Sequence, residues 1–357
     1  MKHTLYITIF LFLVFSGCTK KANDQKASLP EKFDNGVLFL NEGNFNYANA
    51  SVDYLDFGMD TVFESVFFAV NGFMPGDVLQ SAYADSSVIL FVVNNSGKII
   101  VVDRETLKYK ATVSGLTSPR YVTKFSNKYF VTDLYSPYIT VVDDITFEPK
   151  GTIKVGHSTG EIILHDGYLY TVSWRKDNKL WKIDPINLSV ADSLVVGYEP
   201  NSLEVDKDGY LWVLCDGGVE PDTLQDSLPV LVKVEPENMD IEKIYFFRSK
   251  KMSPTDLEMN SKRDMLYFLN TSWTLDDNVF GIYRMSVYDS QLPEQAFIPQ
   301  NDRRFYSLKT DSQTDEIYVS DVKDFMQASD VYRFTSDGRL INIYPAGVIT
   351  GDFLFVR

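Results

Sequence analysis

Short runs of β-branched and aromatic residues alternate with polar turns along almost the whole chain. The clearest recurring unit is a strand that ends in an acidic residue, as in Lys98–Asp103, Tyr138–Asp143 and Lys179–Asp184. Each of these strands follows another apolar run that stops on a small or polar residue. Looser copies begin near Val37, Tyr210, Met265 and Glu316. A unit made only of strands and repeated about every 40 to 50 residues is typical of a β-propeller. The pattern predicts seven blades.

The two ends of the chain are predicted to share one blade. Six repeats start with an additional strand, whereas the first begins at Val37 directly with its second strand. The segment Thr350–Val356 has the pattern of the missing strand, so we expect it to become the innermost strand of the first blade. This closure leaves no open radial edge. Residues 36–357 are therefore predicted to form one all-β domain, a closed seven-bladed β-propeller without long helices.

Residues 1–17 have the features of a bacterial lipoprotein signal peptide. Lys2 supplies a positive charge, Leu5–Phe15 is apolar, and Phe15-Ser-Gly-Cys18 matches the site at which a cysteine becomes lipidated. An ordinary signal peptide is the alternative. Residues 18–35 are predicted to be the lipidated cysteine and a flexible, polar tether. We expect an outer-membrane protein held only by its lipid, and the pattern leaves open whether it faces the cell surface or the periplasm.

The composition argues against several classes of function. A net charge of −15 disfavours binding to nucleic acid or to an anionic membrane surface. We find no histidine pair with metal-ligand spacing, no Gly-x-Ser-x-Gly motif and no glycine-rich phosphate loop. Cys215 ends an apolar strand and is predicted to be a buried thiol. We therefore expect no enzyme and no cofactor, with one metal alternative: carboxylates from several blades holding calcium in the central channel.

Aromatic residues gather in one class of loop. In a propeller blade, the loop between the second and third strands opens on the face where the innermost strand starts. Solvated hairpin tips usually carry Gly, Asn, Asp and Ser. Binding residues concentrate on such loops of a rigid scaffold, so we predict a ligand-binding face; packing of the rings on one another is the alternative. The loops carry Phe45, Tyr47, Tyr135, Trp174, Arg175, Trp273, Phe325 and Met326.

The starts of the innermost strands add polar groups to this face. Two further residues, His157 and Tyr198, lie just before such starts. Flat aromatic surfaces surrounded by polar groups suit a bulky, polar-rimmed and mostly uncharged ligand. The residues predicted to surround the mouth of the channel are Asp77, Arg120, Glu161, Asn201, Thr255, Arg304 and Asp352.

The segments Val37–Phe45 and Ala50–Asp56 carry a resemblance to a known family. They contain the motif Asn41-Glu42-Gly43-Asn44 and, with the lipidation site upstream, resemble the start of the YncE-like propeller lipoproteins of Gram-negative gut bacteria. The resemblance covers residues 36–357. Relatives of the BtuG type capture cobalamin and pass it to a TonB-dependent outer-membrane transporter, and the resemblance implies the same role here. It implies no particular ligand residue.

The leading hypothesis is a non-enzymatic envelope lipoprotein that binds cobalamin or a related corrinoid on the loop face. The neutral imidazole of His157 is then a candidate axial ligand of the cobalt, and capping of a turn is its alternative. Two other functions remain open: a glycan- or protein-binding surface module, and a propeller hydrolase or lyase with a metal in the channel. The predicted ligand-binding residues are Phe45, Tyr47, Arg120, Tyr135, His157, Trp174, Arg175, Tyr198, Asn201, Trp273, Arg304 and Phe325.

Overall fold

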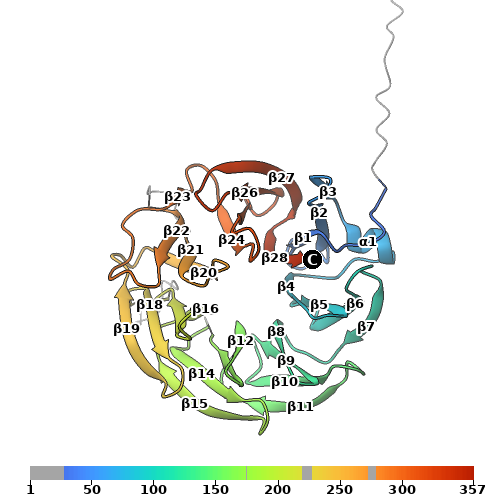
Figure 1. The fold of residues 1–357 in the computed structure, drawn as a ribbon. Helices are drawn as coiled ribbons and strands as arrows, with labels where there is room; N and C mark the ends of the chain where they lie inside the picture. Colours follow the sequence, from blue (N-terminus) through green and yellow to red (C-terminus); the bar gives the residue numbers. More distant parts are fainter. Residues whose placement is uncertain (1–27, 174, 219–226, 272–278) are drawn as a thin grey trace, which may run out of the picture. The chain divides into compact units, whose positions relative to one another are not determined.

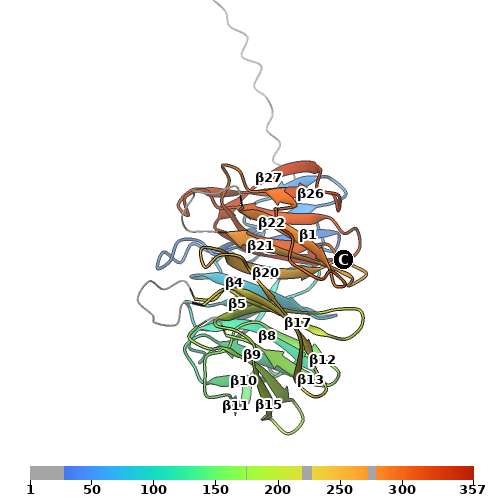
Figure 2. The same ribbon diagram turned by 90° about the vertical axis from the view of Figure 1, so that its left-hand side faces the viewer.

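The computed structural model describes residues 28–173, 175–218, 227–271 and 279–357. Contacts divide the chain into Met1–Pro30 and Glu31–Arg357, and the fold is that of the second unit. In this unit, seven four-stranded antiparallel sheets surround a central axis (Figure 1). Figure 2 shows the same ring from the side, where the connections between strands collect on two opposite faces. The predicted seven-bladed β-propeller is confirmed.

The strands of each blade run from the axis outward in chain order, except in blade 1. Blade 1 contains β28 (Thr350–Val356), β1 (Gly36–Asn41), β2 (Ser51–Asp56) and β3 (Thr61–Phe63). Blade 2 contains β4 (Leu79–Ala84), β5 (Val88–Val93), β6 (Lys98–Asp103) and β7 (Tyr109–Val113). Blade 3 contains β8 (Pro119–Phe125), β9 (Lys128–Asp133), β10 (Tyr138–Asp143) and β11 (Pro149–Lys154).

The remaining four blades follow the same order. Blade 4 contains β12 (Ile162–His165), β13 (Tyr168–Thr171), β14 (Lys179–Asp184) and β15 (Ser189–Val195). Blade 5 contains β16 (Pro200–Val205), β17 (Leu211–Cys215), β18 (Val230–Glu235) and β19 (Asp240–Phe246). Blade 6 contains β20 (Ser253–Met259), β21 (Met265–Thr271), β22 (Gly281–Ser286) and β23 (Ile298–Pro299). Blade 7 contains β24 (Phe305–Thr310), β25 (Ile317–Asp321), β26 (Ala328–Phe334) and β27 (Leu340–Val348).

Strand β28 closes the ring as predicted. It pairs antiparallel with β1, and Phe39 lies opposite Phe353 in the register. The two rings meet edge to face with centroids 5.6 Å apart. At the end of the pair, the Thr350 hydroxyl donates to the Asn41 side-chain oxygen at 2.7 Å. The C-terminal strand is therefore an integral part of blade 1 and leaves that sheet without an open inner edge.

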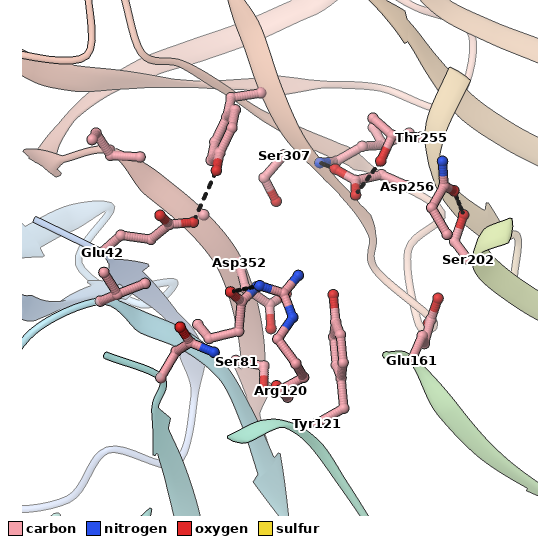
Figure 3. Close-up of a pocket in the computed structure, with 18 of the residues that line it drawn as sticks. Glu42, Ser81, Arg120, Tyr121, Glu161, Ser202, Thr255, Asp256, Ser307 and Asp352 are labelled. Carbon is pink, nitrogen blue, oxygen red and sulfur yellow. Dashed lines mark hydrogen bonds between the residues drawn. The ribbon is translucent and has the colours of Figure 1, made fainter. Parts of the chain in front are cut away.

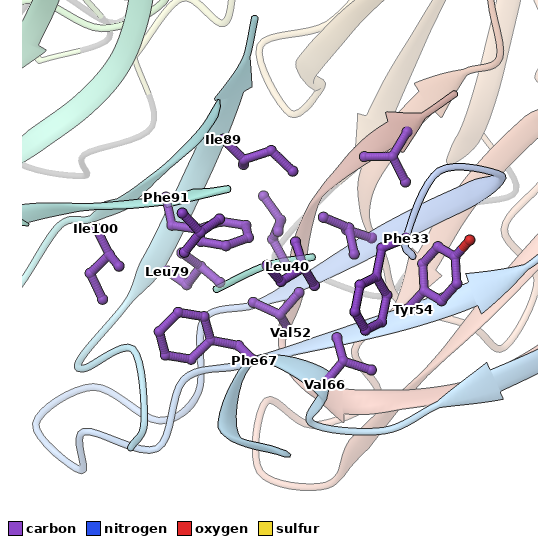
Figure 4. Packing of buried hydrophobic residues seen from close by; sticks show 14 of the residues in the cluster. Phe33, Leu40, Val52, Tyr54, Val66, Phe67, Leu79, Ile89, Phe91 and Ile100 are labelled. Atoms are coloured by element: carbon purple, nitrogen blue, oxygen red, sulfur yellow. The ribbon is translucent and has the colours of Figure 1, made fainter. Parts of the chain in front are cut away.

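Apolar side chains between neighbouring blades form the core. Figure 4 shows the cluster between blades 1 and 2, where Leu40 and Val52 pack against Leu79 and Phe91. All four are fully buried. Burying one such side chain stabilises the fold by roughly 1.5–3 kcal/mol. Equivalent clusters lie between the other pairs of blades, so most of the stability comes from contacts between blades.

Two kinds of element were not predicted from the sequence pattern. The outermost strands, such as β11 with its Pro149, are largely exposed and show little alternation of apolar and polar residues. A short helix, α1 (Val66–Asn71), lies in the connection from β3 to β4. It buries Val66 and Phe67 and ends at Gly72, whose φ of 76° is left-handed. Six residues are too few for a helical period to be recognised.

The acidic residue that ends the third strand of several blades has a structural role. The Asp103 carboxylate accepts hydrogen bonds from the Thr106 N–H at 3.1 Å and the Thr106 hydroxyl at 2.9 Å. Asp143 and Asp184 bind the backbone N–H three residues ahead in the same way. Aspartate is favoured in turns because of such hydrogen bonds to the local backbone. This repeated acid therefore shapes the turns on the face opposite the aromatic loops.

Candidate functional site

A cavity of about 1020 Å³ opens on the aromatic loop face and continues into the central channel. Residues from the innermost strands of all seven blades and from several loops between second and third strands line it. Small-molecule sites usually occupy roughly 300–1,000 Å³, so this cavity fits a large small molecule. Ten of its lining residues are labelled in Figure 3.

The mouth of the cavity carries aromatic rings that are partly exposed to solvent. Phe45 keeps 63% and Tyr135 61% of its surface exposed, although both line the cavity. The guanidinium of Arg175 lies 5.0 Å from the centre of the Tyr135 ring. Phe325 lines the mouth from blade 7, with the guanidinium of Arg304 5.6 Å from its ring centre. The mouth therefore offers flat apolar surfaces with cations beside them.

The backbone of the lining is unusually often left-handed. Among the lining residues that the structure describes, six other than glycine have a positive φ: Val78, Lys176, Glu199, Asp256, Phe325 and Ile349. A positive φ is a genuine outlier for β-branched or bulky side chains such as Val78, Ile349 and Phe325. Such strain costs of order 1–3 kcal/mol per residue and clusters at functional sites. It therefore supports a functional role for the cavity.

Bulges in the innermost strands accompany this strain. In six of the seven blades, the pairing of the first and second strands shifts register near the start of the innermost strand. A bulge re-aims the side chains that follow it, and bulges are over-represented beside active sites. The alternation of inward and outward side chains is therefore interrupted at the height of the cavity.

An ion pair lies at the deep end of the cavity. The Lys309 ammonium of β24 lies 2.8 Å from a carboxylate oxygen of Glu258 on β20. Burial lowers the pKa of Lys309, but the charges of Glu258 and Asp352 outweigh this effect and hold the pKa well above its usual value. Lys309 therefore remains charged at neutral pH and neutralises part of the acidic channel.

Several carboxyl groups of the cavity titrate near neutral pH. Burial raises the pKa of Asp256 and of Glu42 to about 7, and that of Asp352 to about 6. Burial also raises the pKa of Glu161 well above its usual value, although the charge of Lys309 opposes the change. Asp256, Glu42 and Asp352 therefore exchange protons in the physiological range, so their carboxyl groups can both donate and accept hydrogen bonds. Within the described ranges, no group of three or more His, Cys, Asp or Glu residues is arranged to hold a metal ion.

Most of the predicted site residues that the structure describes line the cavity. They are Phe45, Arg120, Tyr135, Arg175, Asn201, Arg304 and Phe325. The amide of Asn201 is engaged by the protein, since its nitrogen donates to the Pro254 carbonyl at 2.8 Å and its oxygen accepts from the Ser202 hydroxyl at 2.8 Å. Trp174, Trp273 and the lipidation residue Cys18 lie outside the described residues.

Three predicted residues, Tyr47, His157 and Tyr198, lie outside the cavity lining, and their part in ligand binding stays a prediction. The exposed imidazole of His157 packs beside Trp181, with ring centroids 5.7 Å apart. Tyr47 is 73% exposed at a loop tip, and Tyr198 is also absent from the lining. Of the predicted polar ring, Asp77 does not line the cavity either: its carboxylate accepts the Asn46 N–H at 2.9 Å and braces the loop.

Sequence reasoning missed several lining residues, chiefly Glu42, Tyr121, Tyr306, Glu258 and Lys309. Glu42 belongs to the Asn41–Asn44 motif, which the sequence marks only through a family resemblance. The other four lie on innermost strands whose bulges disrupt the period of two. For these five residues, the motif was therefore the one feature of the sequence that could have indicated a place in the cavity lining.

The fold and the site together define the class of protein. It is a closed seven-bladed β-propeller with a large, charged cavity at the mouth of its central channel. The chain belongs to the family of the domain of unknown function DUF5074, whose model matches residues 35–347. Among curated proteins, none matches this chain.

Solved structures share the fold at low sequence identity. A quinonprotein alcohol dehydrogenase-like protein from Bacteroides thetaiotaomicron has a TM-score of 0.69 at 14% identity, covering 91% of this chain and 79% of that one. A protein from Lactobacillus plantarum has a TM-score of 0.64 at 13% identity, covering 90% and 100%. BamB from Moraxella catarrhalis has a TM-score of 0.51 at 15% identity, covering 76% and 75%. These likenesses support the propeller fold, and the finer resemblance to YncE-like and BtuG-type proteins stays a prediction.

Proposed function

We propose that this protein binds cobalamin or a related corrinoid in the cavity of its loop face and does not transform it chemically. The observation that carries the proposal is the cavity of about 1020 Å³, lined by strained loops and by groups from every blade. A cavity of this size lies at the upper end of the range of small-molecule sites. A rigid closed ring also avoids the cost of ordering the site when the ligand binds.

The chemistry of the lining supports a broad ligand with a polar rim. Phe45, Tyr135 and Phe325 offer aromatic surface at the mouth, and polar groups from the innermost strands line the same cavity. A corrin ring has two wide faces and a rim of amides that both donate and accept hydrogen bonds. Lining carboxyl groups that titrate near pH 7, such as Glu42 and Asp256, can donate a hydrogen bond to the C=O of an amide when protonated and accept one from its N–H when ionised. Because His157 lies outside the lining, capture rests on stacking and amide hydrogen bonds.

Calorimetric titration of the purified propeller tests this proposal. Cyanocobalamin, a panel of oligosaccharides and calcium chloride are titrated separately into residues 28–357. The proposal expects saturable heat with cyanocobalamin and none with the other two. Heat with an oligosaccharide but not with the corrinoid would overturn it and favour the second candidate.

That second candidate is a glycan- or protein-binding surface module. Tyr47 and Met326 favour it, since they are 73% and 67% exposed at loop tips and lie outside the cavity lining. Aromatic side chains exposed in this way are common at binding surfaces. Replacing both by Ala separates the two functions: it weakens binding to a macromolecular surface and spares a ligand that lies inside the cavity.

We further propose that the propeller is lipid-anchored in the outer membrane through Cys18 and passes its ligand to a TonB-dependent transporter. The support is the signal-peptide pattern of residues 1–18 and the resemblance of the first blade. Among the residues that the structure describes, no helix is long and apolar enough to span a bilayer. Stable anchoring by acyl chains takes at least two of them, as on a diacylated cysteine. Cys18→Ala is expected to abolish palmitate labelling, and unchanged labelling would contradict the anchor.

A further inference from the structure

The carboxyl group of Glu42 is held at a defined place in the cavity wall. Its Oε1 accepts a hydrogen bond from the Tyr306 hydroxyl at 3.1 Å. The backbone of Gly351 on β28 approaches it so closely that a Cβ at this position would lie 2.4 Å from Oε1. Any other residue at 351 would displace the carboxyl group. Strand β28 and Tyr306 therefore fix Glu42 from two different blades.

The rest of the Asn41–Asn44 motif braces the same corner of the cavity. The Asn41 side chain donates to Asp53 at 2.8 Å and accepts from Thr350 at 2.7 Å, which ties β1 to β2 and β28. The Asn44 side chain donates to the Phe325 carbonyl at 3.0 Å and so reaches into blade 7. Phe325 in turn meets the Tyr306 ring edge to face, with centroids 5.5 Å apart. The motif thus builds a rigid corner with one carboxyl group directed into the cavity.

A cation faces the same part of the cavity. Arg120, at the start of β8 in blade 3, lines the cavity together with Glu42 (Figure 3). One of its terminal nitrogens donates to the side-chain oxygen of Gln80, which orients the guanidinium. The electrostatic influence of Arg120 reaches Glu42, since it opposes the rise in the pKa of Glu42 that burial causes. A hydrogen-bond acceptor and a cationic donor are therefore presented to one ligand.

We propose that Glu42 and Arg120 form a subsite that recognises one primary carboxamide of the ligand; this rests on the proposed function. The guanidinium donates to the amide oxygen, and the carboxylate accepts a hydrogen bond from the amide nitrogen. A ligand carboxylate at this place is repelled by Glu42, and a ligand ammonium is repelled by Arg120. A neutral amide can form hydrogen bonds with both Glu42 and Arg120 and is repelled by neither. The pair thus selects against the hydrolysed form of the ligand as well as binding the intact form.

The test compares intact cyanocobalamin with its monocarboxylates, in which one peripheral amide at a time is hydrolysed. Titrations at pH 8 use the wild type, Glu42→Gln and the control Glu148→Gln, which neutralises an exposed carboxylate outside the lining. A hydrogen bond to a charged group contributes enough for roughly tenfold discrimination. We expect the wild type and Glu148→Gln to bind one monocarboxylate about tenfold more weakly than the intact ligand. Glu42→Gln should discriminate less than about threefold, because glutamine can also donate to a carboxylate.

The pH dependence of the wild type provides a second readout that needs no mutant. The groups acting on Glu42 are Arg120 from β8, Tyr306 from β24 and Asp352 from β28. Since burial raises the pKa of Glu42 to about 7, its protonated form donates to a ligand carboxylate at pH 6. Discrimination by the wild type should therefore fall between pH 8 and pH 6. Tyr306→Phe removes a hydrogen bond that lowers this pKa, so the fall should occur at a higher pH.

The possible outcomes separate the two proposals. A wild type that does not bind cyanocobalamin overturns the proposed function and the subsite together. A wild type that binds it but accepts every monocarboxylate equally well at pH 8 overturns the subsite alone. Unchanged discrimination in Glu42→Gln also overturns the subsite alone. Discrimination that is lost in Glu42→Gln and that falls with pH in the wild type supports it.

Discussion

The interfaces between blades and the central cavity are built from opposite kinds of residue. At the interface of blades 1 and 2, Leu40 and Phe91 are fully buried among other apolar side chains. The cavity instead collects acidic and basic residues, and Lys309 and Glu258 form an ion pair at its deep end. Buried charge is expensive unless it is well paired. The difference indicates that the interfaces provide stability, whereas the charged lining of the cavity costs stability, as functional sites often do.

Opening the ring is expected to have the largest effect on the stability of the protein. Deleting residues 351–357 removes most of β28, together with Phe353 and Val356 of the inter-blade cores. The loss of a whole strand pairing and its buried side chains should cost well over ~5 kcal/mol, which is comparable to the total stability of a domain. The measurement is thermal unfolding followed by circular dichroism. A truncated protein that melts at the wild-type temperature would contradict the closure.

Removing an aromatic ring from the mouth should affect binding and not stability. Tyr135→Ala is expected to weaken corrinoid binding by about 1–3 kcal/mol, as for a truncated anchor residue. Its melting temperature should stay close to that of the wild type because 61% of its surface is exposed. Tyr288→Ala is the matched control: Tyr288 has the same exposure but does not line the cavity. Equal affinities of the two variants would show that the mouth does not bind the ligand.

The cavity carboxyls should make stability depend on pH. Burial raises the pKa of Asp256 to about 7, with help from Glu258 and Asp352 and against the Leu308 N–H and Lys309. The folded protein then holds a proton that the unfolded chain has lost, so the free energy of unfolding falls as pH rises from about 4 to about 7. We estimate ~1 kcal/mol for such a partly solvated group.

A single substitution isolates this effect. Asp256→Asn should leave stability nearly unchanged at pH 5 and raise it at pH 8 relative to the wild type, as measured by chemical denaturation. The amide oxygen can still accept the Leu308 N–H that now bonds the carboxylate at 3.0 Å. Asp240→Asn, at an exposed position that begins β19, changes the net charge equally and serves as the control. A loss of stability of similar size at both pH values would mean that Asp256 is a structural group.

The sequence pattern predicted the architecture because period-two strands and their turns repeat in every blade. It predicted the ring closure because Thr350–Val356 was the only segment left to pair with β1. The site was predicted only in part, since bulges re-aim side chains such as Tyr306 and Lys309 toward the axis. His157 was predicted to face the ligand, whereas its imidazole packs beside Trp181 outside the cavity lining, because the position of a loop residue depends on such contacts. Local patterns do not encode such contacts between strands.

Crystals of the propeller soaked with cyanocobalamin would show directly whether the cavity binds a corrinoid. We expect density for the corrin ring in the cavity, in contact with Tyr135 and Phe325, with one peripheral amide between Glu42 and Arg120. Density for the ligand outside the cavity, or no density at a concentration that saturates the calorimetric signal, would contradict it.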